Sequence, residues 1–269
     1  MLSKSEFKKE KYCVDDLREI VRILREPGGC PWDAQQSHKS VRRDLLEEAY
    51  EVADAIDTDD KTALCEELGD LLLQVFFHAR ISEEDKDFTL DDVADGICKK
   101  LILRHPHVFG DVKADTAEQV LDNWDAIKRD EKSQKTHTDT LESVPRAFPA
   151  LMRAAKVQKR AAKAGFDWDN ADDAFKKLPE ELAEFSEAVQ LNNQAKMEEE
   201  FGDLLFAAVN VSRFYKIDAE ASLASATDKF MSRFKAVEQK VIESGRDMKE
   251  LSLEELDTIW DEVKASKSN

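Results

Sequence analysis

Glycine and proline are scarce in this chain, with 8 glycines and 6 prolines in 269 residues. These two residues disfavour the interior of a helix most strongly, whereas Ala, Leu, Glu and Lys, which are abundant here, favour it. Convincing runs of alternating apolar and polar residues, the pattern of a half-buried strand, are also missing. The sequence therefore predicts an all-α fold and argues against a substantial sheet.

Positive charge is in deficit, with 40 Lys and Arg against 58 Asp and Glu and a formal net charge of −18. Non-specific nucleic-acid binding and attraction to anionic membranes both need a basic surface. No apolar run reaches the length of a membrane span, and residues 1–11 lack the apolar core of a signal peptide. We therefore expect neither nucleic acid nor membrane as a partner.

Cysteine is infrequent, and no two cysteines stand in a Cys-x-x-Cys arrangement. The four are Cys13, Cys30, Cys65 and Cys98, and all lie in the first half of the chain. This usage is typical of reduced thiols, so we expect a cytoplasmic protein.

Two acidic patterns, Glu-Glu-x-x-Glu and then Glu-x-x-Asp, occur twice along the chain. The first copy is Glu47, Glu48, Glu51, Glu67 and Asp70, and the second is Glu180, Glu181, Glu184, Glu200 and Asp203. Carboxylates three positions apart are neighbours on a helix surface, and a short reversal between two such helices brings four of them together. Clustered carboxylates need a cation, and oxygen ligands suit a hard one, so we expect Mg²⁺.

A charged outer surface is the simpler explanation of Glu-rich helices. On a helical wheel, however, Glu48 borders the apolar stripe of its helix, and Glu67 and Asp70 take matching positions on the next helix. We expect Asp70 to be partly buried, where an unpaired carboxylate is costly, so the metal site is favoured. A di-iron site is disfavoured because no His follows the key glutamates at the third position.

The polar stretch Asp130–Asp139 predicts a linker, which gives domains of residues 1–135 and 136–269. We expect helices near residues 14–26, 40–57, 61–83, 90–104 and 117–133, and again near 147–164, 172–191, 195–215, 219–244 and 253–266. Pro179 suits the first turn of a helix, so we expect the helix near 172–191 to begin there instead. The repeated order of features predicts a duplicated module.

Basic and aromatic residues also repeat after each acidic pair. The first set is Lys100, Arg104, Trp124 and Lys128, and the second is Lys229, Arg233, Trp260 and Lys264. Like charges one turn apart favour an anion such as phosphate, and a Trp beside an ammonium can stack a base. Salt bridges to surface acids and packing of the Trp in the core are the simpler alternatives for each pair alone.

The chain resembles the MazG-type nucleoside triphosphate pyrophosphohydrolases of the full-length, two-domain kind, nearly end to end. In the first half the resemblance rests on Gly29-Cys30-Pro31-Trp32-Asp33, Glu47-Glu48-x-x-Glu51, Glu67-Leu68-Gly69-Asp70 and Arg104-His105-Pro106-His107-Val108-Phe109. In the second half it rests on Gly165-Phe166-Asp167-Trp168, Glu180-Glu181-x-x-Glu184 and Glu200-Phe201-Gly202-Asp203-Leu204-Leu205.

This resemblance implies an all-α homodimer in which each acidic helix pair completes a four-helix bundle. It implies Mg²⁺-dependent hydrolysis of nucleoside triphosphates to monophosphate and pyrophosphate. The residues expected to bind metal and act in catalysis in the second half are Glu181, Glu184, Glu200 and Asp203, with Glu48, Glu51, Glu67 and Asp70 as their metal-binding counterparts. Nucleotide is expected at Lys229, Arg233, Trp260 and Lys264, at Lys177 as a weaker candidate, and at the matching Lys100, Arg104, Trp124 and Lys128.

The expected mechanism is attack of water on the α-phosphorus without a covalent intermediate, with one carboxylate, not singled out by the sequence, accepting the proton. Two alternatives stay open. One is a more selective all-α pyrophosphohydrolase acting on dUTP or on a phosphoribosyl-nucleotide. The other is a non-catalytic helical regulator that senses nucleotides.

Overall fold

The computed structural model describes residues 8–113, 116–131 and 136–266, and every regular element in these ranges is helical. The all-α prediction is confirmed. The chain divides into two compact units, Met1–Lys128 (unit 1) and Arg129–Asn269 (unit 2). Within the described residues no helix is long and apolar enough to cross a membrane.

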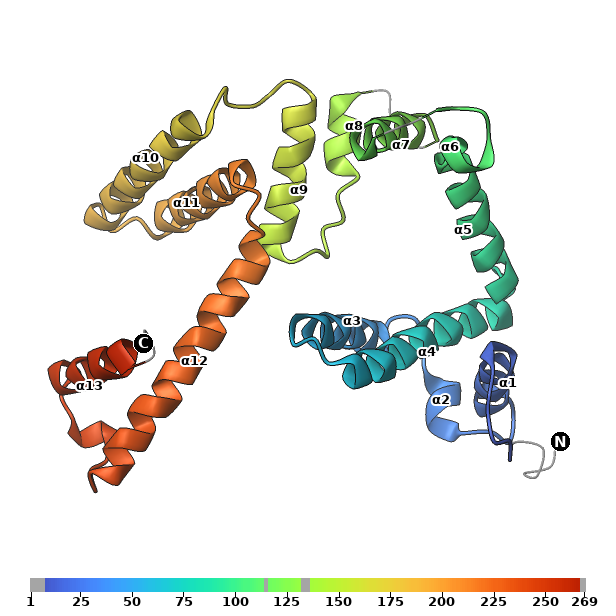
Figure 1. The fold of residues 1–269 in the computed structure, drawn as a ribbon, viewed down its shortest axis with the longest axis horizontal. Coiled ribbons are helices and arrows are strands. Elements are labelled where there is room, and N and C mark those ends of the chain that lie inside the picture. Colours follow the sequence, from blue (N-terminus) through green and yellow to red (C-terminus); the bar gives the residue numbers. More distant parts are fainter. Residues whose placement is uncertain (1–7, 114–115, 132–135, 267–269) are drawn as a thin grey trace. The chain divides into compact units, whose positions relative to one another are not determined.

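Unit 1 begins with α1 (Val14–Arg25) and α2 (Pro31–Gln35) and continues with the acidic helices α3 (Arg42–Asp57) and α4 (Lys61–Asp85). It then runs through α5 (Leu90–Arg104), α6 (Pro106–Phe109) and α7 (Ala117–Glu131), whose last residues pass the unit limit. Figure 1 shows α3 and α4 side by side as a helical hairpin, which we call the first acidic hairpin.

Unit 2 contains α8 (His137–Glu142), α9 (Ala150–Lys163), α10 (Ala171–Gln190), α11 (Gln194–Phe214), α12 (Ala219–Glu243), a 3₁₀ turn at Met248–Glu250 and α13 (Leu253–Ser266). The helices α10 and α11 pack together as the second acidic hairpin, and α9 packs against α11 (Figure 1). The two hairpins thus repeat one plan within the chain.

Both acidic hairpins reverse direction through the same three-residue turn. In unit 1, Asp59 takes a left-handed backbone (φ 53°) and the Asp60 side chain caps α4 by accepting hydrogen bonds from two backbone N–H groups. In unit 2, Asn192 (φ 48°) and Asn193 fill the same two roles before α11. Asp and Asn tolerate both duties better than most residues, so the sequence fixes each reversal locally.

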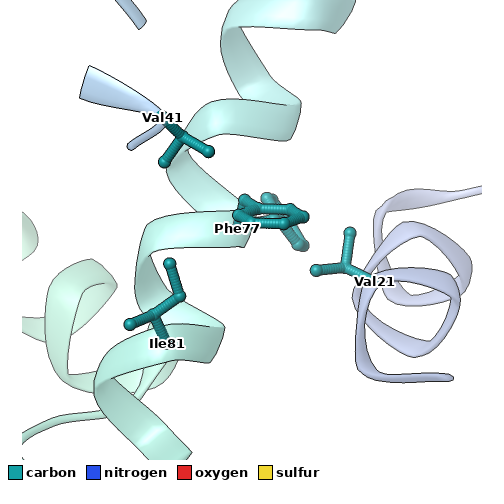
Figure 2. Packing of buried hydrophobic residues seen from close by; sticks show 5 residues of the cluster. Val21, Val41, Phe77 and Ile81 are labelled. Atoms are coloured by element: carbon teal, nitrogen blue, oxygen red, sulfur yellow. The ribbon is translucent and has the colours of Figure 1, made fainter. Parts of the chain in front are cut away.

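A small apolar core fastens α1 to the first acidic hairpin. Val21, Val41, Phe76, Phe77 and Ile81 are buried together, and Figure 2 shows the Phe77 ring lying near Val21 and Val41. In unit 2 the buried apolar residues are smaller, mainly Val and Ala. Both hairpins also carry exposed large apolar side chains, such as Leu68 in unit 1 and Leu182 in unit 2.

The predicted start of the second acidic helix at Pro179 is wrong. The helix α10 begins at Ala171, where the Asn170 side chain accepts a hydrogen bond from the Asp173 N–H at 2.9 Å, and Pro179 lies inside it. Proline lacks the N–H that would bond to the carbonyl four residues earlier, but the long helix continues through this defect.

The predicted linker is too long at its C-terminal end. Helix α8 starts at His137, because Thr136 and Asp139 form a reciprocal capping box with N–O distances of 2.8 and 3.1 Å. Residues 132–135, which contain the predicted end of the first domain, lie outside the described residues. Three short helices, α2, α6 and α8, were not expected from the sequence.

Candidate metal and nucleotide site

The first acidic hairpin brings carboxylates from both of its helices to one place. Oxygens of Glu48, Glu67 and Asp70 all lie within 4.8 Å of one another, and we call these three residues the first acid cluster. Glu51 lies outside this cluster, but its negative charge is near enough to raise the pKa of both Glu48 and Glu67. Three of the four predicted acids of this unit therefore gather in one place, with the fourth nearby.

Burial and like charge act together on this cluster. The pKa of Glu48 is raised, first by burial and then by the negative charges of Asp70 and Glu51. The pKa of Glu67 is raised for the same reasons, with Glu51 as the strongest neighbouring charge. Among the described residues no Lys or Arg forms an ion pair with these carboxylates. Such a group of repelling oxygens is a strong attractor for a divalent cation.

The second acidic hairpin gathers Glu181, Glu184 and Glu200 in the same manner, with oxygens all within 4.8 Å of one another. We call them the second acid cluster. Glu181 and Glu200 are buried, at 8% and 5% exposure, while Glu184 is exposed. The pKa of Glu184 is raised, first by partial loss of hydration at its carboxyl group and then by the charges of Glu181 and Glu200. The second acidic hairpin thus places two buried carboxylates on adjoining helices, where they could hold a metal ion.

Asp203 and Asp70 also differ from expectation. Asp203 is exposed and lies outside the second acid cluster. Asp70 belongs to the first cluster but is exposed, so the prediction of its partial burial is wrong. The apolar core buries Phe77, two turns further along α4, but does not extend to Asp70.

The structure pairs the predicted Arg and Trp in both units. The Arg104 guanidinium carbon lies 5.6 Å from the Trp124 ring centroid, and the Arg233 carbon lies 5.9 Å from that of Trp260. Both distances fit a cation–π contact. Phe230 also packs against Trp260, with ring centroids 5.3 Å apart. A planar aromatic group beside a guanidinium is thus present twice, although the two members of each pair are far apart in sequence.

The lysines of these sets take more exposed places. Lys100, Lys229 and Lys264 are exposed, and Lys128 is half-buried. The helix α5, which carries Lys100, packs on the acidic helix α4, whereas α12, which carries Lys229, packs on α9 and α13. The single chain therefore assembles the acids and the Arg–Trp pairs as separate groups within each unit.

Known proteins show the same two segments. Residues 36–109 and 171–238 both match the MazG nucleotide pyrophosphohydrolase domain. The chain is 43% identical over 256 residues to the nucleoside triphosphate pyrophosphohydrolase of Escherichia coli K12, which covers 93% of this chain and 97% of that protein. The corresponding enzyme of Thermotoga maritima is 43% identical over 250 residues, covering 93% and 95%. The chain belongs to the MazG family.

Family membership confirms the predictions of a MazG-type chain and of a hydrolase. The first MazG segment contains α3, α4 and α5, and the second contains α10, α11 and most of α12, so each includes one acid cluster and the Arg of one Arg–Trp pair. The Bacillus subtilis uncharacterized protein YabN is 47% identical over 251 residues, which cover 92% of this chain and 50% of YabN.

Each MazG segment is preceded by a Trp-Asp dipeptide, and an arginine binds a residue in or next to this dipeptide. Arg213 of α11 donates to the Asp167 carboxylate at 2.9 Å, and this ion pair lowers the pKa of Asp167. In unit 1 the buried Arg25 donates instead to the Asp33 backbone carbonyl at 2.6 Å and pairs with Glu84 at 2.8 Å. Sequence reasoning missed both arginines because their partners are distant in the chain.

Two lysines contact the second acid cluster directly. The Lys177 ammonium lies 2.8 Å from both Glu180 and Glu181, and the Lys196 ammonium lies 2.9 Å from Glu200. The pKa of each lysine is raised, chiefly by these hydrogen bonds. Lys177 was a predicted site residue, but Lys196 was not, although its position four residues before Glu200 is the signal that predicts an ion pair on a helix.

Proposed function

We propose that the chain hydrolyses nucleoside triphosphates to nucleoside monophosphate and pyrophosphate, with Mg²⁺ as the metal and little preference for the base. The observation that carries the proposal is the convergence of carboxylates from two helices in each of two MazG segments. The names of the Escherichia coli and Thermotoga maritima relatives support the substrate class.

The donor set fits a hard divalent cation because every candidate ligand atom is a carboxylate oxygen. The proposed ligands are Glu181, Glu184, Glu200 and Asp203 in unit 2, and Glu48, Glu51, Glu67 and Asp70 in unit 1. When bound, Mg²⁺ supplies neutralising charge for the triphosphate and lowers the pKa of a coordinated water. Burial and neighbouring negative charges raise the pKa of Glu48 and of Glu184, and a bound cation would relieve this repulsion.

The reaction is a single displacement. A water oxygen forms a bond to the α-phosphorus while the bond from that phosphorus to the bridging oxygen breaks, and pyrophosphate leaves with the electron pair. One carboxylate of the cluster accepts the proton of the water. Because the carboxylates repel the triphosphate, nearby cations must hold it in place.

The residues that we propose for nucleotide binding supply these cations and an aromatic surface. They are Lys177, Lys229, Arg233, Trp260 and Lys264 in unit 2, and Lys100, Arg104, Trp124 and Lys128 in unit 1. The Arg–Trp contacts in both units support this role, since a guanidinium binds phosphate oxygens in a forked manner while the indole stacks on a base.

We further propose that the working form is a homodimer in which acidic hairpins of two copies form four-helix bundles. The chain exposes 19759 Å², whereas two separate compact domains of half its mass would together expose about 14,000 Å². Large apolar side chains on the hairpins account for part of the excess, among them Tyr50, Leu68, Leu182 and Phe201, each about half exposed. A second copy would cover these faces and bring more basic residues near the acids.

The test is Mg²⁺-dependent pyrophosphate release from a panel of nucleotides that includes dUTP. We expect broad activity that falls by at least about a hundredfold in Glu184→Ala or Asp203→Ala if unit 2 carries most of the turnover. Matched variants of unit 1, Glu51→Ala and Asp70→Ala, measure the share of the first site. Full activity in all four variants, with the helical circular dichroism unchanged, would reject the assignment. Activity on dUTP alone would support a selective enzyme instead.

A further inference from the structure

The two acid clusters differ in the residues that stand one helical turn before their glutamates. In unit 2 these are Lys177, four before Glu181, and Lys196, four before Glu200. At the corresponding places of unit 1, four residues before Glu48 and Glu67, the chain has Asp44 and Ala63. The same backbone plan therefore presents two ammonium groups in one hairpin and neither in the other.

Both lysines touch the carboxylates that are most buried. Lys177 lies 2.8 Å from Glu181 and shares its charge with Glu180, while Lys196 lies 2.9 Å from Glu200. The two glutamate side chains are 10% and 7% exposed, so their negative charges are poorly screened by water. An ammonium at this distance neutralises much of the negative charge that would otherwise attract a metal ion.

The first acid cluster has no such internal compensation among the described residues. Its three carboxylates lie within 4.8 Å of one another, and the chain has Asp44, another acid, at the position that Lys177 occupies in unit 2. A divalent cation entering this cluster relieves repulsion and breaks no ion pair. A cation entering the second cluster must first displace two ammonium groups.

From this difference we propose that Lys177 and Lys196 act as internal counter-ions, which weaken the binding of free divalent cations to the second acid cluster. Without nucleotide, the first acid cluster therefore binds a metal ion at a lower concentration than the second. The inference rests on the proposed function, because it assumes that both clusters are metal sites. Lys196 then has a positioning role at the carboxylates. Metal binding at the second acid cluster depends on the release of the two lysines from their glutamates.

The test uses Mn²⁺ alone as the probe and the full chain without nucleotide, with free Mn²⁺ counted by electron paramagnetic resonance. Glu67→Gln disables the first cluster, so that the remaining binding reports the second. In that background we expect Lys196→Met to tighten Mn²⁺ binding about fivefold or more, the factor that matches an ion pair of about 1 kcal/mol. Lys177→Met should have a smaller effect, because its charge is shared.

Lys176→Met is the matched control, since Lys176 lies on the same helix but pairs with Asp173 at 2.6 Å, outside the cluster. It should leave Mn²⁺ affinity unchanged. In the reciprocal Glu200→Gln background, the first cluster should bind Mn²⁺ more tightly than the second does in the Glu67→Gln chain. Lys→Gln variants repeat the measurement if a Met variant loses helical circular dichroism.

The outcomes separate the two proposals. Equal Mn²⁺ affinities in the two backgrounds, or lysine variants that behave like Lys176→Met, overturn the counter-ion inference while leaving the metal sites in place. An absence of Mn²⁺ binding in every chain, with or without a nucleoside triphosphate, overturns the proposed function itself and the inference with it.

Discussion

In unit 1 the acidic hairpin holds Glu48, Glu67 and Asp70 together with no ion-paired Lys or Arg among the described residues, whereas in unit 2 two lysines contact Glu181 and Glu200. The hairpins share their turn geometry, their helix order and the spacing of their acids. A duplicated module can therefore keep its shape while the electrostatic state of its site changes. Residues one turn away from the candidate ligands make the difference.

The units also differ in the way they hold the Trp-Asp segment that precedes each MazG domain. In unit 1 the buried Arg25 bonds to two backbone carbonyls, those of Asp33 and Gln36, and to Glu84. In unit 2 the pair Arg213–Asp167 is more accessible to solvent, with the two side chains 19% and 28% exposed. Arg25 is thus a buried side chain with several partners, whereas Arg213 and Asp167 form a partly exposed ion pair. Removing Arg25 should therefore destabilise its unit more than removing Arg213 does.

The largest expected effect comes from removing these arginines. Arg25→Ala removes a buried guanidinium that donates to Glu84 and to two backbone carbonyls, while Glu84 keeps its contact with Arg80 at 3.0 Å. The loss of these hydrogen bonds should destabilise unit 1 by about 3 to 4 kcal/mol. Arg213→Ala should cost unit 2 only about 1 kcal/mol. Hydrogen–deuterium exchange of peptides from α4 and α11 reads the two units separately. Equal losses of protection in both variants would contradict the distinction between the buried Arg25 contacts and the more accessible Arg213–Asp167 ion pair.

A smaller effect is expected at Pro179, which has Leu46 as its counterpart in unit 1. Pro179→Leu restores an N–H that can bond to the Phe175 carbonyl and should stabilise α10 by up to about 3 kcal/mol. Exchange of the α10 amides should slow, while the amides of α3 stay unchanged as the internal reference. If α10 loses protection, the proline is required for the helix geometry and our interpretation of it as a defect is wrong.

The smallest expected effect is a pH dependence confined to unit 1. His38 and His78 contact each other through their Nδ1 atoms at 2.7 Å, and burial, with His38 as a second cause, lowers the pKa of His78. A lowered histidine pKa means that the stability it contributes is complete above the ordinary value of about 6.5 and is lost as the pH falls below it.

Amide exchange in α1 and α4 should therefore accelerate more between pH 7 and pH 5.5 than the intrinsic exchange rate explains, and His78→Gln should remove this difference. Unit 2, whose described histidine is the exposed His137, supplies the control. An equal response in both units would assign the effect to the acidic surface as a whole.

The sequence allowed most helices to be placed to within a few residues, because capping residues and turn residues define their ends locally. Ser252 and Glu255, for example, form a capping box before α13, with N–O distances of 2.9 and 3.2 Å. The gathering of carboxylates was also predictable, since it follows from their spacing on two helices joined by a short turn.

The remainder depends on contacts that spacing does not reveal. Helix propensity and the cap at Asn170 outweigh Pro179, so α10 begins eight residues before the predicted start. The exposure of Asp70 depends on how far the apolar core extends along α4. The ion pair of Lys196 depends on which of several nearby acids its side chain contacts. Arg25 acts on residues up to 59 positions away in the chain, which no local pattern indicates.

The most direct test of the central claim, that these acid clusters bind Mg²⁺ for hydrolysis at the α-phosphorus, is to follow oxygen from the solvent into the products. We predict that a nucleoside triphosphate turned over in H₂¹⁸O with Mg²⁺ gives labelled monophosphate and unlabelled pyrophosphate, and that EDTA stops the reaction. Label in the pyrophosphate, release of orthophosphate in its place, or undiminished turnover in EDTA would contradict the account.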